Sequence, residues 1–165
     1  MQKIIAVLLL FVGVEIFATY QVGDTIPNFC WNTVNETKFC VDDAKETVRV
    51  LVYNAGWCPP CNAEMEELAP KVSEFQGKPV TFISLSTAGW VKYSPADVPF
   101  LREWRDRYKI PFTVAAAPSS EMYQFFTQPR IPNVAILRKD GKLAYKAIGA
   151  SPETIFSQVR RLLGE

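Results

Sequence analysis

The sequence contains no histidine, and this absence excludes several kinds of site at once. A catalytic triad built on histidine, a histidine-ligated zinc and the C-x-x-C-H motif of covalent haem all require imidazole. An excess of charge of either sign is also lacking, since 18 Lys and Arg stand against 17 Asp and Glu. A net charge of +1 is far from the basic character of nucleic-acid-binding proteins, and we expect no nucleic-acid partner.

Cysteine is scarce, with only four residues in a chain of 165. A chain of this length forms one domain and buries enough surface to fold without metals or a dense set of disulfides. The hydrophobic fraction of 48% is that of a globular protein. Because the sequence has no repeats and no low-complexity tracts, the four cysteines are where reactive chemistry is to be sought.

The N-terminus has the pattern of a signal peptide. Lys3 precedes an apolar run at residues 4–17, interrupted by Glu15, and Ala18 is a small residue before the predicted cleavage point. The run is shorter than the about 20 residues that span a membrane. We therefore predict a signal peptide at residues 1–18, a domain at residues 19–165 and export to the periplasm or a similar compartment. An uncleaved membrane anchor and a buried helix are the alternatives.

The remaining sequence alternates strand and helix patterns. Apolar runs at residues 48–53 and 80–85 predict buried strands, and residues 133–137 and 143–148 predict a hairpin around a Lys-Asp-Gly turn. Apolar spacing predicts a helix over residues 61–75, kinked at Pro70, and another over 101–108. A final helix begins after Ser151, and residues 112–115 and 121–126 predict a short strand and a short helix. This order predicts an α/β fold, with a mixed sheet flanked by helices and preceded by an N-terminal hairpin at residues 30–40.

The motif WCPPC at residues 57–61 lies between a predicted strand and a predicted helix. The positive end of a helix stabilises a thiolate, so the pKa of Cys58 is expected to be below its free value. Cys61 follows one turn later and can attack a mixed disulfide formed by Cys58. Pro59 and Pro60 have no N–H, which limits the donors available to the thiolate. Half of a zinc site and a purely structural disulfide are the alternatives to a redox dithiol.

These residues resemble the active site of the thioredoxin superfamily, and more closely that of exported TlpA/ResA-type thiol–disulfide oxidoreductases. The pattern G-x-x-x-P-x-F at residues 23–29 is similar to the start of that family, and Ile131-Pro132 precedes a strand where the superfamily has its cis-proline. The resemblance implies a thioredoxin-like three-layer fold with an added N-terminal β-hairpin. Val52 departs from the pattern, because it stands in place of the buried aspartate of thioredoxin.

The resemblance also implies roles for individual residues. Cys58 would be the nucleophile and Cys61 the resolving thiol, while a cis Pro132 would lie beside them and the backbone of Ile131 would pair with substrate. Trp57 would line the rim of the site, although a lone aromatic residue is as readily part of the core. Glu64 falls where the family carries a glutamate that could move protons, with a solvated helix position as the alternative.

Three functions fit these residues. The first is an exported reductase of protein disulfides, for example in cytochrome c maturation, with no cofactor or metal and a membrane thiol donor of the DsbD/CcdA type as partner. The second is a DsbA-like oxidase or isomerase, which the missing histidine disfavours. The third is a non-catalytic binding module. A peroxiredoxin is disfavoured because Ala55 stands where its motif requires threonine. We expect a monomer.

Cys30 and Cys40 flank a predicted turn near Asn35. Opposite positions of an antiparallel hairpin bring side chains close enough for a disulfide, and export would let that bond persist. We predict a structural disulfide between them. Two free thiols, a second redox pair and a metal site shared with Cys58 and Cys61 remain alternatives.

Overall fold

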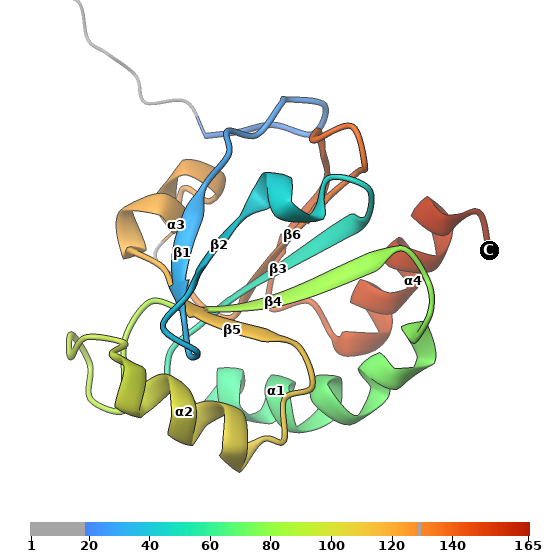
Figure 1. Ribbon diagram of the computed structural model, residues 1–165. Helices are drawn as coiled ribbons and strands as arrows, with labels where there is room; N and C mark the ends of the chain where they lie inside the picture. Colours follow the sequence, from blue (N-terminus) through green and yellow to red (C-terminus); the bar gives the residue numbers. More distant parts are fainter. Residues whose placement is uncertain (1–18, 129) are drawn as a thin grey trace, which may run out of the picture.

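The computed structural model describes residues 19–128 and 130–165, and the predicted signal peptide lies outside these residues. The described chain forms one sheet flanked by helices, in the order expected from the sequence (Figure 1). The strands are β1 (Cys30–Thr33), β2 (Lys38–Cys40), β3 (Val48–Asn54), β4 (Val80–Ser86), β5 (Thr113–Ala116), β6 (Asn133–Leu137) and β7 (Leu143–Ile148). The α-helices are α1 (Pro59–Lys71), α2 (Val98–Arg107), α3 (Ser119–Phe125) and α4 (Pro152–Leu163), with short 3-10 helices at η1 (Val41–Ala44) and η2 (Val72–Phe75).

The sheet is mixed, and its strand order is β2-β1-β5-β4-β3-β6-β7. Strands β3, β4 and β5 run parallel, because each connection returns through a helix. The β6–β7 hairpin adds antiparallel to β3, and the β1–β2 hairpin adds antiparallel to β5. The predicted mixed α/β sheet with an added N-terminal hairpin is therefore confirmed.

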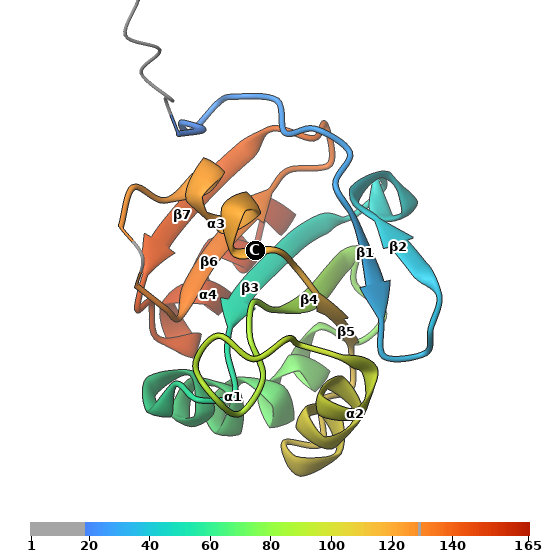
Figure 2. The ribbon, with the colours of Figure 1, turned by 90° about the vertical axis from the view of Figure 1, so that its left-hand side faces the viewer.

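Strand β3 is buried along its whole length, and its side chains alternate between two cores. Val50 and Val52 face the core formed with α1, α2 and α4, whereas Leu51 and Tyr53 face the core formed with α3 and the N-terminal segment. Figures 1 and 2 show α3 across the sheet from α1. This three-layer arrangement leads the buried strand β3 to the start of α1, where Trp57, Pro59 and Pro60 reach the surface.

The helix predicted over residues 61–75 differs from the observed one at its C-terminal end. The α-helix ends at Lys71, directly after Pro70, and the chain continues as the 3-10 helix η2. Pro70 has no N–H to donate to the carbonyl of Glu66, four residues earlier, and this weakens the last turn and favours the end of the α-helix over a kink.

Candidate active site

The dithiol lies where the buried strand β3 gives way to α1. Cys58 is the N-cap residue of α1, Pro59 and Pro60 occupy its first positions, and Cys58 and Cys61 are joined by a disulfide. The backbone N–H of Cys61 donates a hydrogen bond to Cys58 Sγ at 3.3 Å. This donor and the positive end of the helix are placed to stabilise negative charge on Cys58 when the disulfide opens.

The loop before β6 lies next to the sulfur of Cys58. The Ile131–Pro132 peptide bond is cis, and Pro132 is buried. Cys58 Sγ lies 3.7 Å from the carbonyl oxygen of Ile131. Trp57 is 37% exposed, which places it on the rim of the site and not in the core. The structure therefore brings together Trp57, Cys58, Cys61, Ile131 and Pro132.

Glu64 lies one helical turn after Cys61 and is only 7% exposed. Its Oε2 has no hydrogen-bond partner among the described residues. Burial raises the pKa of Glu64 to about 8, so the carboxyl is protonated at neutral pH. The alternative of a solvated helix position is wrong for Glu64, although it holds for the exposed Glu66 and Glu67. The side chain is a buried carboxyl on the helix that holds the dithiol.

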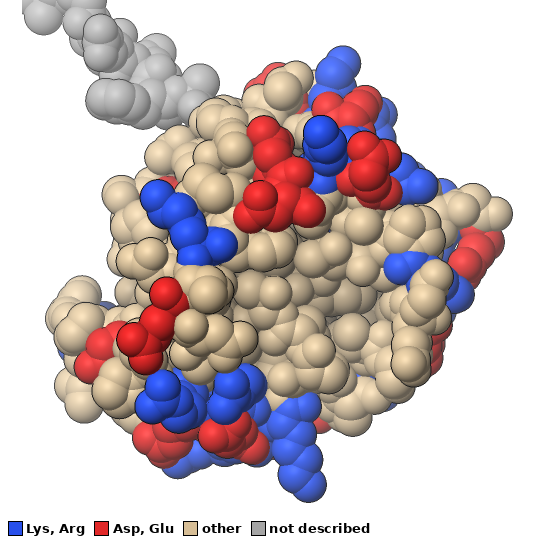
Figure 3. Space-filling view, viewed as in Figure 1, with Lys and Arg blue, Asp and Glu red and all other residues tan. Residues whose placement is uncertain are grey.

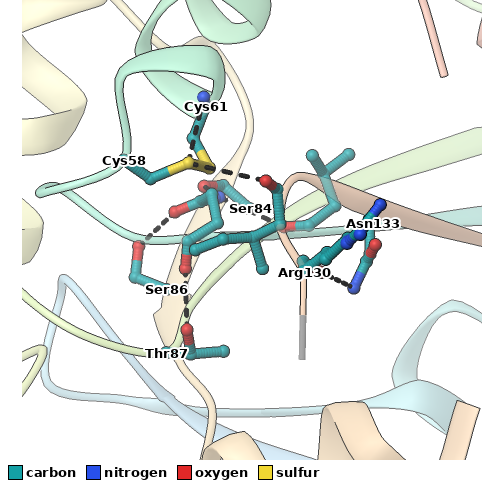
Figure 4. The surroundings of a disulfide bond; sticks show 10 residues. Cys58, Cys61, Ser84, Ser86, Thr87, Arg130 and Asn133 are labelled. Atoms are coloured by element: carbon teal, nitrogen blue, oxygen red, sulfur yellow. Dashed lines mark hydrogen bonds between the residues drawn. A yellow bond between two sulfur atoms is a disulfide. The ribbon is translucent and has the colours of Figure 1, made fainter. Parts of the chain in front are cut away.

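A buried polar network behind the dithiol was not foreseen from the sequence (Figure 4). The amide nitrogen of Asn54 donates to Ser84 Oγ at 2.8 Å, and Ser86 Oγ donates to the amide oxygen of Asn54 at 2.7 Å. Thr87 Oγ1 donates to the backbone carbonyl of Asn54 at 3.0 Å. These bonds join the ends of β3 and β4, which fixes the backbone leading to Cys58. The sequence signal for this network was the presence of three polar residues, Asn54, Ser84 and Ser86, in the otherwise apolar ends of β3 and β4.

A second buried carboxyl, that of Glu121, was also not predicted from the sequence. Trp31 Nε1 donates to both of its oxygens, at 3.0 and 2.8 Å, and the hydroxyl of Tyr53 donates to Oε1 at 2.8 Å. Burial raises the pKa of Glu121, and the hydrogen bonds from Tyr53 and Trp31 oppose that shift. The cluster joins α3 to β1 and β3, on the face of the sheet opposite α1.

Cys30 and Cys40 form the second disulfide, across the β1–β2 hairpin. The two residues are directly opposite each other, and their Cα atoms are 4.0 Å apart. Because each of the four cysteines is paired within its own local motif, none of them is free to share a metal with the other pair. Among residues 19–128 and 130–165, no group of three potential metal ligands is present. No helix in this part of the chain is long and apolar enough to span a membrane.

Comparison with known proteins agrees with this geometry. The AhpC/TSA family matches residues 22–146. The thiol–disulfide oxidoreductase ResA of Bacillus cereus is 27% identical over 132 residues, which cover 78% of this chain and 70% of ResA. Thioredoxin C-2 of Corynebacterium nephridii is 32% identical over 102 residues, covering 59% of this chain and 93% of the relative.

Solved structures show the same fold. A thioredoxin-family thiol:disulfide interchange protein of Chlorobium tepidum superposes with a TM-score of 0.72 at 19% identity, covering 86% of this chain and 97% of that one. A secreted disulfide oxidoreductase of Mycobacterium tuberculosis, homologous to E. coli DsbE, gives a TM-score of 0.63 at 21% identity, covering 81% and 96%. With a C-x-x-C disulfide at the start of α1, this chain belongs to the AhpC/TSA family and is a thiol–disulfide oxidoreductase of the thioredoxin fold.

Proposed function

We propose that this protein is an exported reductase that opens disulfides in protein substrates. Cys58 is the attacking group and Cys61 the resolving group, with Trp57 and the Ile131–Pro132 loop holding the substrate. Support comes from the N-cap position of Cys58 and from the Cys61 N–H that points at its sulfur. The relatives named ResA carry the same class of activity in their names.

The exchange consists of two substitutions at sulfur. The Cys58 thiolate attacks one sulfur of the substrate disulfide, forming a mixed disulfide and releasing the other substrate sulfur as a thiolate, which takes up a proton. The Cys61 thiolate then attacks Cys58 Sγ, so that the Cys58–Cys61 disulfide forms and the second substrate thiol leaves. Two electrons pass from the protein to the substrate. A membrane thiol donor restores the dithiol by the same exchange in the opposite direction.

Glu64 is placed to serve the second step. The resolving thiol must lose its proton before it attacks, and Cys61 is fully buried, so bulk water is a poor acceptor. A carboxyl with a pKa of about 8, one turn along the same helix, exchanges protons readily near neutral pH. The ionised minority of Glu64 would therefore accept the Cys61 proton as the disulfide closes, and the protonated form would return a proton as it opens.

The observation that carries the proposed direction is the small number of donors at Cys58 Sγ. Among the described residues, the Cys61 N–H is the one donor bonded to this sulfur, since Pro59 and Pro60 have none to offer. Strong oxidants such as DsbA are oxidising because their reduced form is stabilised, with a strongly depressed thiol pKa. With less stabilisation of the thiolate, the dithiol here is expected to favour donating electrons.

Several finer statements belong to the same proposal. Residues 1–18 would direct export, and residues 19–165 would form the functional domain. The partner that keeps the dithiol reduced would be of the DsbD/CcdA type, and the substrates would include apocytochrome c cysteines. The similarity to ResA and to a secreted mycobacterial protein supports the proposed export of a thiol–disulfide oxidoreductase. The protein would act as a monomer without cofactor or metal.

Equilibration with glutathione tests the direction of electron flow. We expect a potential for Cys58–Cys61 closer to about −270 mV, the value of thioredoxin, than to about −120 mV, the value of DsbA. A potential more positive than about −160 mV would contradict the reductase and favour the oxidase.

Trapping of mixed disulfides identifies the partners. Cys61→Ser should accumulate covalent complexes through Cys58, because the resolving step is lost. Cys58→Ser is the matched control and should accumulate few. Complexes with apocytochromes or a membrane reductase would support the proposal, and complexes with a wide range of newly exported proteins would favour an oxidase. A non-catalytic binding module would form no complexes and reduce no disulfide.

A further inference from the structure

A cavity of about 470 Å³ opens beside Cys58, on the side of the Ile131 loop. Its wall is built from four distant parts of the chain: the residue before the nucleophile, the loop between β4 and α2, helix α3 and Ile131 in the loop before β6. Trp57, Met122 and Tyr123 are among its apolar lining residues, and Met122 is buried. The volume suits one or two side chains of a bound peptide segment.

The loop between β4 and α2 is tied to the backbone that leads into the dithiol. The N–H of Trp57 donates to the carbonyl of Gly89 at 3.1 Å, and the N–H of Gly56 donates to the carbonyl of Ala88 at 3.2 Å. A Cβ at Gly56 would lie 2.6 Å from the ring of Phe100 and 2.9 Å from the Gly89 oxygen, so only glycine allows this approach. These contacts fix the position of the loop relative to Cys58. Figure 2 shows the loop lying beside α1 and α2.

The tip of this loop is apolar and exposed. Val91 is 69% exposed and Tyr93 is 87% exposed. Tyr93 holds a left-handed backbone with a φ of 68°. Together with Trp57 and Tyr123, these two residues are four of the six large exposed apolar side chains in residues 19–128 and 130–165. A concentration of this kind around one cavity indicates a surface that binds a protein partner.

Lys92 is the one charged residue that lines the cavity. Its Nζ lies 5.5 Å from the ring centre of Trp57 and 5.1 Å from that of Tyr93. No carboxylate in the described part of the chain forms an ion pair with Lys92. The face in Figure 3 mixes acidic and basic groups without a broad field of one sign.

We propose that the protein substrate carries an acidic side chain and an apolar side chain within a few residues of its reactive cysteine. The acidic side chain pairs with Lys92, and the apolar side chain enters the cavity between Trp57, Met122 and Tyr123. An extended segment fits this arrangement, because alternate side chains of such a segment project to opposite sides and reach different subsites. The inference rests on the proposed function, since the cavity is lined by Trp57, which precedes the attacking cysteine, and by Ile131, whose carbonyl oxygen lies 3.7 Å from Cys58 Sγ.

Docking is tested first without redox exchange. The oxidised full-length protein is titrated with dye-labelled peptides in which serine replaces the cysteine and a neighbouring residue is either Glu or Lys. Fluorescence polarisation should show about fivefold tighter binding of the Glu peptide. Lys92→Glu should reverse this preference. Lys139→Glu, which makes the same charge change at the β6–β7 turn at the opposite end of β3, should retain it.

The same pair of peptides, with cysteine restored in a disulfide to a chromophore, then measures reduction by the dithiol form. The ratio of kcat/KM for the Glu and Lys peptides should be about 5 in the wild type and below 1 in Lys92→Glu, and this ratio is insensitive to a general loss of activity. Discrimination in docking without reduction of either peptide would contradict the proposed reductase and leave the docking surface supported.

Three results would overturn the inference. The first is an equal affinity of the wild type for the Glu and Lys peptides. The second is the same preference in Lys92→Glu as in Lys139→Glu. The third is a concentration-dependent dimer, detected by sedimentation, that Lys92→Glu dissociates and Lys139→Glu does not. That result would assign the surface to a second copy of this chain.

Discussion

Two regions of this molecule combine a disulfide with a buried glutamate, yet they differ in how the carboxyl is satisfied. At the start of α1, Glu64 follows the Cys58–Cys61 disulfide, and its Oε2 has no partner among the described residues. In the hairpin region, Trp31 follows Cys30 and donates to Glu121, which also accepts from Tyr53.

Burial raises the pKa of both carboxyls, but only Glu121 is held by donors that oppose the shift. A satisfied buried carboxyl stabilises a fold, whereas an unsatisfied one next to a dithiol is available to exchange a proton. The comparison teaches that burial alone does not distinguish these two glutamates, whereas their hydrogen-bond partners do.

The largest effect is expected from Glu121→Ala. The substitution leaves Trp31 Nε1 and the Tyr53 hydroxyl buried without an acceptor, and it leaves a cavity under α3. We expect a loss of about 3–4 kcal/mol in the free energy of unfolding, measured by urea denaturation. Glu121→Gln keeps an acceptor and should cost clearly less. Equal losses for the two variants would show that an amide oxygen cannot replace the carboxyl as the acceptor for Trp31 and Tyr53.

Removing the hairpin disulfide sharpens the contrast between the two cysteine pairs. Cys30→Ser/Cys40→Ser should lower the free energy of unfolding by about 3 kcal/mol, because the unfolded chain is no longer constrained by a loop. Turnover by Cys58 and Cys61 should be unchanged, since the hairpin lies at the far edge of the sheet. Urea denaturation without reductant and a disulfide-reduction assay provide the two measurements. A parallel loss of turnover would instead make Cys30 and Cys40 a second redox pair.

Glu64→Gln is expected to change how stability depends on pH. Between its ordinary value of 4.5 and the folded pKa of about 8, the unfolded chain releases the Glu64 proton while the folded chain keeps it. The folded state therefore binds more protons in this window, and its stability falls as pH rises, by up to about 1.4 kcal/mol per pH unit. Above about pH 8 the folded carboxyl ionises as well, and this contribution levels off.

Because glutamine does not titrate, Glu64→Gln should remove this contribution when urea midpoints are compared at pH 5 and pH 8. Glu66→Gln, at an exposed position of the same helix, is the matched control and should behave as the wild type does. If the two variants show the same pH dependence, Glu64 does not retain its proton in the folded protein.

The smallest effect concerns a single donor in the Glu121 cluster. Tyr53→Phe removes one hydrogen bond while Trp31 still holds the carboxyl, so we expect a loss of about 1 kcal/mol. The exposed Tyr123→Phe is the control for loss of a hydroxyl, and its urea midpoint should not move. A loss from Tyr53→Phe as large as that from Glu121→Ala would mean that Trp31 contributes nothing.

Local signals predicted most of the fold. The predicted strands agree with β3, β4, β6 and β7 within one residue at each end. Ser151 caps α4 by accepting from the N–H of Thr154, as a serine before proline indicates. The beginning of α2 was missed, although Asp97 followed by Pro99 carries the same kind of signal. Such features depend on neighbours in the chain, which is why they can be recognised without the structure.

The candidate site was only partly predictable for the same reason. The C-x-x-C spacing and its place at a helix start identified Cys58 and Cys61 as a candidate dithiol. The Asn54–Ser84–Ser86 network, the Glu121 cluster and the loop around Lys92 each join segments that are distant in sequence. Neither the alternation of apolar and polar residues nor the spacing of a motif predicts contacts between such distant segments.

The sequence by itself determined the class of the protein, because periodicity and a short motif are local properties of the chain. Only the tertiary structure decided that Glu64 is buried while Glu66 is exposed, and that Trp57 lies at a rim. The helical pattern places Glu64 on the same face as Cys61 but does not tell how deeply the packing around it excludes water. Burial and the supply of hydrogen-bond donors depend on contacts between distant segments, and these two quantities set the pKa of a carboxyl and therefore its role.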